Sequence, residues 1–203
     1  MATIRKELIW ATYNRAIALV DINIHKTVEQ GHEFSKQIIL ADESLTEDEK
    51  SEAIRNSTKD MDHNKLLYNE GTKRICENCQ EGCLATLYCE YCIRNYLKAN
   101  FPNWTSGNND VDNLIQKCQL ETLAPNQIVE WIPYNNLQNI KYLTKGGFSE
   151  IYSADWIGGR YFEWDSKNQR LKREIESGVQ YVALKKLENV ESANRSWFEE
   201  VFI

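Results

Sequence analysis

The sequence predicts an α+β protein, with helices in its N-terminal third and antiparallel strands in its C-terminal third. Residues 1–70 contain no proline, and their apolar residues recur at helical spacing. From residue 128 onward, short runs alternate apolar and polar residues in the manner of strands. A dense group of cysteines lies between them. We therefore expect a helical region over 1–71, a cysteine-rich segment with a linker helix over 72–125, and a sheet domain over 126–203.

Composition narrows the classes of function. The chain has 203 residues, 42% of them hydrophobic, which is enough to form a buried core. Its net charge of -6 gives no general attraction to nucleic acid or to an anionic membrane surface. No apolar run approaches the roughly 20 residues that cross a bilayer, and the first residues do not read as a signal peptide. We therefore expect a cytoplasmic protein with neither nucleic-acid nor membrane partners.

Three helices are predicted in the first region. A second helix is expected from His32 to about Leu40, and a third begins at Thr46, where Thr46 and Glu49 have the spacing of a capping box. The apolar positions of the first helix are Ile4, Leu8, Ala11, Ala16, Leu19 and Val20, and those of the third are Ala53, Ile54, Met61 and Leu66. This pattern indicates a small helical bundle. The three histidines, His25, His32 and His63, are interpreted as surface or packing residues.

Two C-x-x-C pairs, Cys76 with Cys79 and Cys89 with Cys92, have the form of a tetrahedral zinc site. Four thiolates would fill the coordination sphere, so the zinc would be structural. The alternatives are free or disulfide-linked cysteines, or a redox dithiol, which the absence of a surrounding βαβ pattern disfavours. Cys83 could replace one of the four or simply pack. Residues 95–110 read as a turn-rich stretch before a short helix capped by Asp110, on which Cys118 is a small buried hydrophobe.

Strand-like runs follow at VEWI, IKYL, EIYSADWI and QYVALKKL. Gly146 and Gly147 join two of these runs, where backbone amides could approach phosphate oxygens closely. Phe148 would cover the site, and Ile151 with Ala183 would contact a base. Lys185 would reach phosphates from its strand, whereas Lys186 would point to the other face of the sheet. The alternative is a plain hairpin with a solvated lysine.

In these residues the chain resembles the N-lobe of a eukaryotic protein kinase, with KGGF in the glycine-rich loop and VALK in the lysine strand. With its helical start, paired C-x-x-C, NWTSGN, DNLIQ and WIPYNNL segments, most of the chain is similar to an expanded family of fungal protein kinases. The resemblance implies binding of ATP with Mg and phosphoryl transfer to protein hydroxyls. It also implies that Glu200, or failing that Glu199, pairs with Lys185. Protein substrates or signalling partners follow from the same resemblance.

Two departures from the kinase pattern affect the expected activity. Thr144 and Ser149 stand where the loop has its first and third glycines. The sequence contains neither the H-R-D catalytic motif nor D-F-G, so we expect a truncated kinase domain that is inactive alone. The alternative is a non-catalytic interaction module, made of the helices and the zinc ribbon, that carries a pseudokinase remnant.

Overall fold

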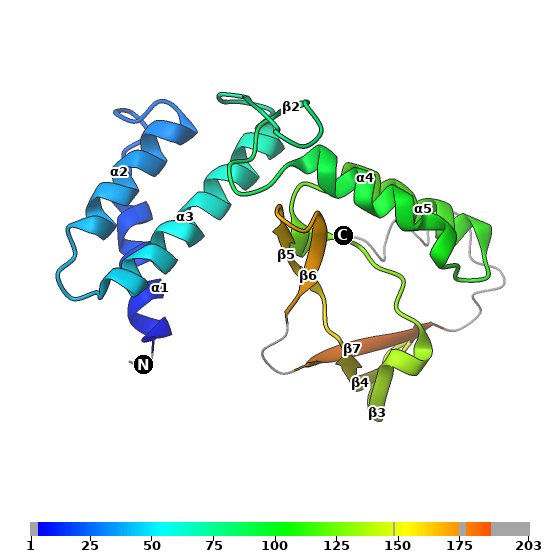
Figure 1. Ribbon diagram of the computed structural model, residues 1–203. Coiled ribbons are helices and arrows are strands. Elements are labelled where there is room, and N and C mark those ends of the chain that lie inside the picture. The colour runs from blue at the N-terminus through cyan, green and yellow to red at the C-terminus, as the bar shows by residue number, and fades with distance from the viewer. Residues whose placement is uncertain (1–3, 148, 175–177, 188–203) are drawn as a thin grey trace. The chain divides into compact units, whose positions relative to one another are not determined.

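The computed structural model describes residues 4–147, 149–174 and 178–187. These ranges contain five α-helices and small antiparallel sheets, which confirms the α+β prediction (Figure 1). The chain divides into two compact units. The first comprises the chain up to Val129 together with Trp164–Leu171, and the second comprises Glu130–Glu163 and the chain from Lys172 onward.

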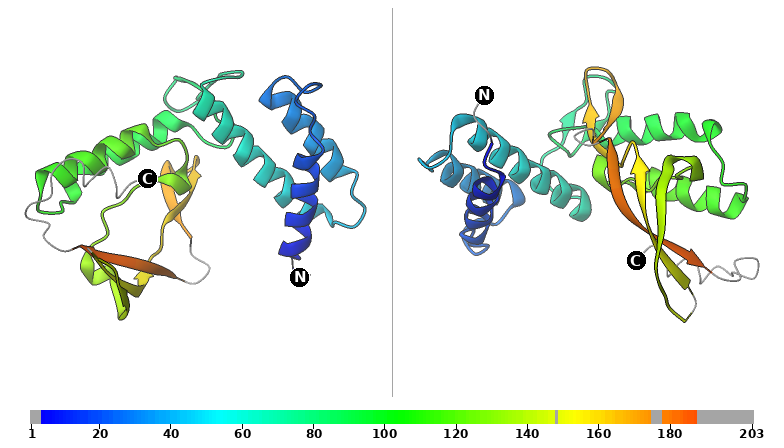
Figure 2. Two further views of the ribbon diagram at one scale, coloured as in Figure 1. Left: turned by 180° about the vertical axis from the view of Figure 1, so that it is seen from behind. Right: turned by 90° about the horizontal axis from the view of Figure 1, so that it is seen from below.

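Three helices at the start of the first unit pack against one another (Figures 1 and 2). They are α1 (Lys6–Ala18), α2 (Val28–Leu40) and α3 (Glu47–Tyr68). Their shared core consists of Ile9, Ala16, Ile39, Leu45 and Ala53. The three predicted helices are confirmed, but the buried face of α1 is wrong in part. Ile9 and Tyr13 are buried. Of the predicted residues, Ala11 is exposed although it lies within α1, and Ile4 and Leu19 are about half exposed and lie outside Lys6–Ala18.

Capping boxes begin two of these helices. The predicted box before α3 is present, with Glu49 N donating to Thr46 Oγ1 at 3.3 Å and Thr46 N donating to Glu49 Oε2 at 2.9 Å. A second box, formed by Thr27 and Gln30, begins α2 at Val28, four residues before the expected start. Among the described residues, no helix combines the length and apolar composition needed to cross a membrane.

The cysteine segment contains a two-stranded hairpin and two helices. Strands β1 (Arg74–Ile75) and β2 (Gly82–Cys83) pair antiparallel, and the helices are α4 (Glu90–Asn100) and α5 (Asn109–Glu121). The expected turn-rich stretch is wrong in its first half, because α4 and a 3-10 turn (η1, Phe101–Asn103) run through it. Asn108, not Asp110, caps α5, and its side chain accepts from the backbone N–H groups of the first turn. A 3-10 turn, η2 (Pro125–Gln127), follows α5.

The second unit is built on a three-stranded antiparallel sheet with strand order β3-β4-β7. After a 3-10 turn, η3 (Tyr134–Asn136), the strands are β3 (Leu137–Lys145), β4 (Ser149–Ile157) and β7 (Val179–Leu187). They match three of the four expected strand runs, and the twisted sheet is visible in Figure 2. The fourth run, VEWI at residues 129–132, forms no strand. Between β4 and β7 lies a hairpin of β5 (Tyr161–Asp165) and β6 (Arg170–Arg173).

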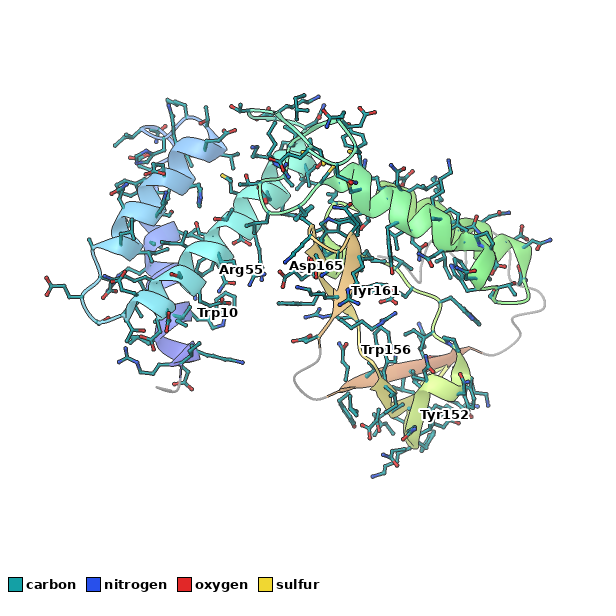
Figure 3. All side chains as sticks on the ribbon, viewed as in Figure 1. Trp10, Arg55, Tyr152, Trp156, Tyr161 and Asp165 are labelled. Atoms are coloured by element: carbon teal, nitrogen blue, oxygen red, sulfur yellow. The ribbon has the colours of Figure 1, made fainter. Side chains whose placement is uncertain are left out.

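One ion pair anchors the base of this hairpin. Arg173 donates to Glu130 Oε2 at 2.6 Å, and its guanidinium lies 3.9 Å from the ring centroid of Tyr161. The same guanidinium lies over the Trp156 ring, 5.9 Å from its centroid, and Figure 3 labels both aromatic residues. Only 10% of the Glu130 side chain is exposed, so its charge depends on Arg173 for compensation.

Candidate functional site

The structure brings the four predicted zinc ligands together. The Sγ atoms of Cys76 and Cys92 are 3.7 Å apart, and those of Cys79 and Cys89 are 3.6 Å apart. All four Sγ atoms lie within 4.8 Å of one another. A zinc–sulfur bond of about 2.3 Å gives a tetrahedron with an edge of about 3.8 Å, which these separations match. All four cysteines are free thiols, and a disulfide would need a sulfur separation of about 2.05 Å. The cluster can therefore hold one tetrahedral metal ion such as zinc.

A tight turn presents the first pair of thiols. Cys76 directly follows β1, its N–H donates to Glu81 O at 2.9 Å, and its carbonyl accepts from Gln80 N at 2.9 Å. Gln80 takes a left-handed conformation with φ of 61°, which reverses the chain toward β2. The turn therefore places Cys79 beside Cys76.

The start of α4 presents the second pair. Cys89 is the N-cap residue of this helix and Cys92 lies in its first turn, so both sulfurs lie near the positive end of the helix dipole. That position favours thiolates. Sequence reasoning predicted no helix over Glu90–Asn100, so it did not predict this contribution of α4.

Buried contacts close the nine-residue gap between the two pairs. Leu84, Ala85 and Tyr88 are buried, and Arg74 donates to the carbonyls of Ala85 at 2.8 Å and Tyr88 at 2.5 Å. Asp62 of α3 also accepts from two backbone N–H groups of this loop. The β1–β2 hairpin itself does not span this gap, because its turn carries the first cysteine pair.

The thiols differ in how easily they ionise. Burial would raise the pKa of Cys76, but hydrogen bonds from the backbone of Cys79 and Asn78 and from neighbouring thiols bring it down to about 7. Burial raises the pKa of Cys92 to about 11 and raises the pKa of Cys89 as well. Metal binding must therefore displace protons from these thiols, and affinity should fall with decreasing pH.

Two cysteines lie outside the four. Cys83 is fully buried, and its Sγ donates to Arg74 O at 3.5 Å, while burial raises the pKa of its thiol. Cys118 is only half buried, although the sequence predicted a buried position. Sequence reasoning missed two polar residues at the site. Asn78 donates to Cys92 Sγ at 3.5 Å, and Glu90 lies beside Cys83 and Cys89. Their positions inside or next to a C-x-x-C pair were the only available signal.

The glycine pair lies in the turn between β3 and β4. Gly146 N donates to Ser149 O at 2.8 Å, and a Cβ added at Gly147 would meet no atom within 4 Å. Neither glycine has a positive φ, so the backbone of this turn does not itself require glycine. Phe148, predicted to cover the phosphates, lies outside the described residues.

The register of β4 and β7 positions the two lysines. Lys185 lies opposite Ile151, and Ala183 lies opposite Ser153, so these side chains share one face of the sheet. Lys186 lies opposite Glu150, and its Nζ is 3.1 Å from Glu150 Oε2. The adjacent lysines therefore project from opposite faces. Lys185 is exposed.

The expected partners of Lys185, Glu200 and Glu199, lie outside the described residues. No protein-family model, curated protein or solved structure matches this chain.

Proposed function

We propose that the chain is a member of the protein kinase family, whose second unit binds ATP with Mg beneath the β3–β4 turn and whose first unit holds a structural zinc ion. The observation that carries the proposal is the register of β4 and β7. It sets Lys185, Ile151 and Ala183 on one face of the sheet, next to the turn that contains Gly146 and Gly147.

These residue types suit an adenine nucleotide. A lysine on a strand offers a fixed positive charge to phosphate oxygens, and two adjacent glycines, which have no Cβ, let backbone amides of the turn approach those oxygens. Ala183 and Ile151 would provide a small and a branched apolar contact for the flat face of a base. Mg and the protein hydroxyl acceptors come from the kinase resemblance, as do cytoplasmic signalling partners.

The zinc has a folding role in this proposal. Four protein thiolates leave no coordination position for a substrate, which is typical of structural zinc. The metal would hold the Cys76–Cys79 turn against the start of α4, in a segment whose strands are only two residues long. Zinc binding would then supply much of the free energy that folds the segment.

The decisive experiment measures nucleotide binding, because the sequence contains no H-R-D or D-F-G motif whose activity could be assayed. ATP with Mg should raise the melting temperature of the full chain. Lys185→Ala should weaken ATP binding about tenfold or more, since a charged hydrogen bond contributes roughly 1.5–3 kcal/mol. Lys186→Ala removes the same charge from the opposite face and is the matched control.

Equal affinities in the two variants, or no ATP-induced shift in the parent chain, would refute the nucleotide site. The second candidate function is then favoured, in which the first unit is an interaction module for a signalling protein. Two isoleucines between α1 and α2 favour it, since Ile22 is 78% exposed and Ile24 is 68% exposed. Ile22→Ser with Ile24→Ser should then abolish partner binding without changing stability.

A further inference from the structure

Cys83, the cysteine of the segment that lies outside the four-cysteine site, belongs to a second group of potential metal ligands. Ligand atoms of Cys83, Cys89 and Glu90 lie within 4.8 Å of one another. The three residues are 0%, 3% and 4% exposed, respectively. Cys89 belongs both to this group and to the four-cysteine site, so the two groups share one sulfur.

One carboxylate oxygen of Glu90 is buried without a hydrogen-bond donor to compensate it among the described residues. Its Oε1 accepts from Leu84 N at 2.8 Å, which fixes the side chain. Its Oε2 is buried, and no hydrogen-bond partner for it is found in the described part of the chain. A buried carboxylate oxygen without a partner is unfavourable by several kcal/mol. Glu90 belongs to the group that also contains two thiols.

We propose that Cys83, Glu90 and Cys89 form a second position for a thiophilic divalent cation of the zinc and cadmium class, with Cys89 bridging the two metals. The proposal rests on the four-cysteine site, which supplies the shared thiolate. Cys83 Sγ, which now donates to Arg74 O at 3.5 Å, would release its proton to solvent and coordinate the metal. Cys89 would coordinate the second metal through another lone pair of the same sulfur, so no atom changes its oxidation state.

The charges balance at this position. A zinc ion with four thiolates carries two negative charges. A second divalent cation brings two positive charges, which the Cys83 thiolate and the Glu90 carboxylate offset. The second metal would therefore compensate Glu90 without changing the net charge of the first site, in a location where an unbalanced charge is strongly disfavoured. The arrangement also gives the fifth cysteine a defined role.

The test counts metal ions on the full chain by native mass spectrometry at saturating zinc, and again at saturating cadmium. The parent chain should hold two ions. Cys83→Ala and Glu90→Gln should each hold one, and the glutamine retains the oxygen that accepts from Leu84 N. Cys118→Ala removes a thiol outside both groups, and it should still hold two ions. In cadmium-113 NMR spectra, the parent chain should give two metal resonances and Glu90→Gln should give one.

A parent chain with one ion at saturating metal would overturn the second position and leave the four-cysteine site intact. Two ions in both Cys83→Ala and Glu90→Gln would overturn it as well. If Cys83→Ala does not fold, Glu90→Gln decides, because it changes only one atom of the carboxylate. No bound metal in the parent chain would overturn the four-cysteine site itself, so the two failures are distinguishable.

Discussion

Asp62 connects the helical bundle to the cysteine loop, and its removal should weaken zinc binding although it is not a zinc ligand. This fully buried residue of α3 accepts from Thr86 N at 2.7 Å and from Leu87 N at 2.8 Å. Each hydrogen bond to a charged group contributes roughly 1.5–3 kcal/mol. Thr86 and Leu87 are exposed, so water can replace the lost acceptor and the low end applies. Asp62→Ala should therefore destabilise the loop by about 3 kcal/mol for the pair.

Because folding and metal binding are coupled in this segment, the same free energy should appear as a loss of zinc affinity of about 100-fold. The assay is competition for zinc with a chromophoric chelator, together with thermal unfolding of the zinc-loaded chain. Asp62→Asn keeps one acceptor oxygen and should lose about half of this free energy. Asp60→Ala, two residues away on α3 and exposed, is the matched control.

Unchanged zinc affinity in Asp62→Ala, with affinity in Asp60→Ala also unchanged, would refute the reasoning. It would mean that the loop closes around the metal without its attachment to α3.

Three further perturbations have expected outcomes. Hydrogen bonds from Arg5 and from the backbone of Thr46 hold the pKa of Glu49 below its ordinary value of 4.5. The stability that this carboxylate contributes is therefore present above pH 4.5 and is lost as the pH falls. Acid unfolding, monitored by circular dichroism, should depend less on pH in Glu49→Gln than in the parent chain. Gly147→Ala should leave the melting temperature unchanged but weaken ATP binding. Gly159→Ala should instead lower the melting temperature, because Gly159 has a φ of 58° and its added Cβ would lie 3.4 Å from the Gln180 side chain. Arg173→Ala should destabilise the second unit by about 2 kcal/mol in denaturant unfolding, less than for a fully buried ion pair because Arg173 is 35% exposed, and an unchanged transition would contradict that role.

The metal site was predictable because its signal is local. A C-x-x-C spacing fixes which two sulfurs share a turn, and the thiols need only two such turns to meet. The capping box at Thr46 was predictable for the same reason. The equivalent box at Thr27 uses Gln30, which the capping-box pattern also allows, yet sequence reasoning started α2 four residues late.

The features that sequence reasoning missed depend on tertiary contacts. The segment after Cys92 contains asparagines and a proline, which favour turns, yet α4 extends to Asn100 because Ile93 and Leu97 are buried on its inner face. The run at residues 129–132 has strand-like composition, but within the described ranges no strand pairs with it. The Glu90 oxygen that has no partner among the described residues could not be predicted from the sequence, since it depends on how the loop between the two cysteine pairs folds against the side chain.

The hairpin of β5 and β6 has a consequence for dissecting the protein. Its tip, Trp164–Leu171, belongs to the first unit, although the chain on either side belongs to the second. Trp164 meets the Tyr96 ring edge-on at 5.7 Å, and Gln169 accepts from Asn78 at 2.8 Å. A recombinant fragment ending at Val129 would thus lack a piece of its own interior, exposing Tyr96 and depriving Asn78, which lies beside the four-cysteine cluster, of its acceptor. Truncation at that boundary should yield a less stable, more aggregation-prone polypeptide than the intact chain.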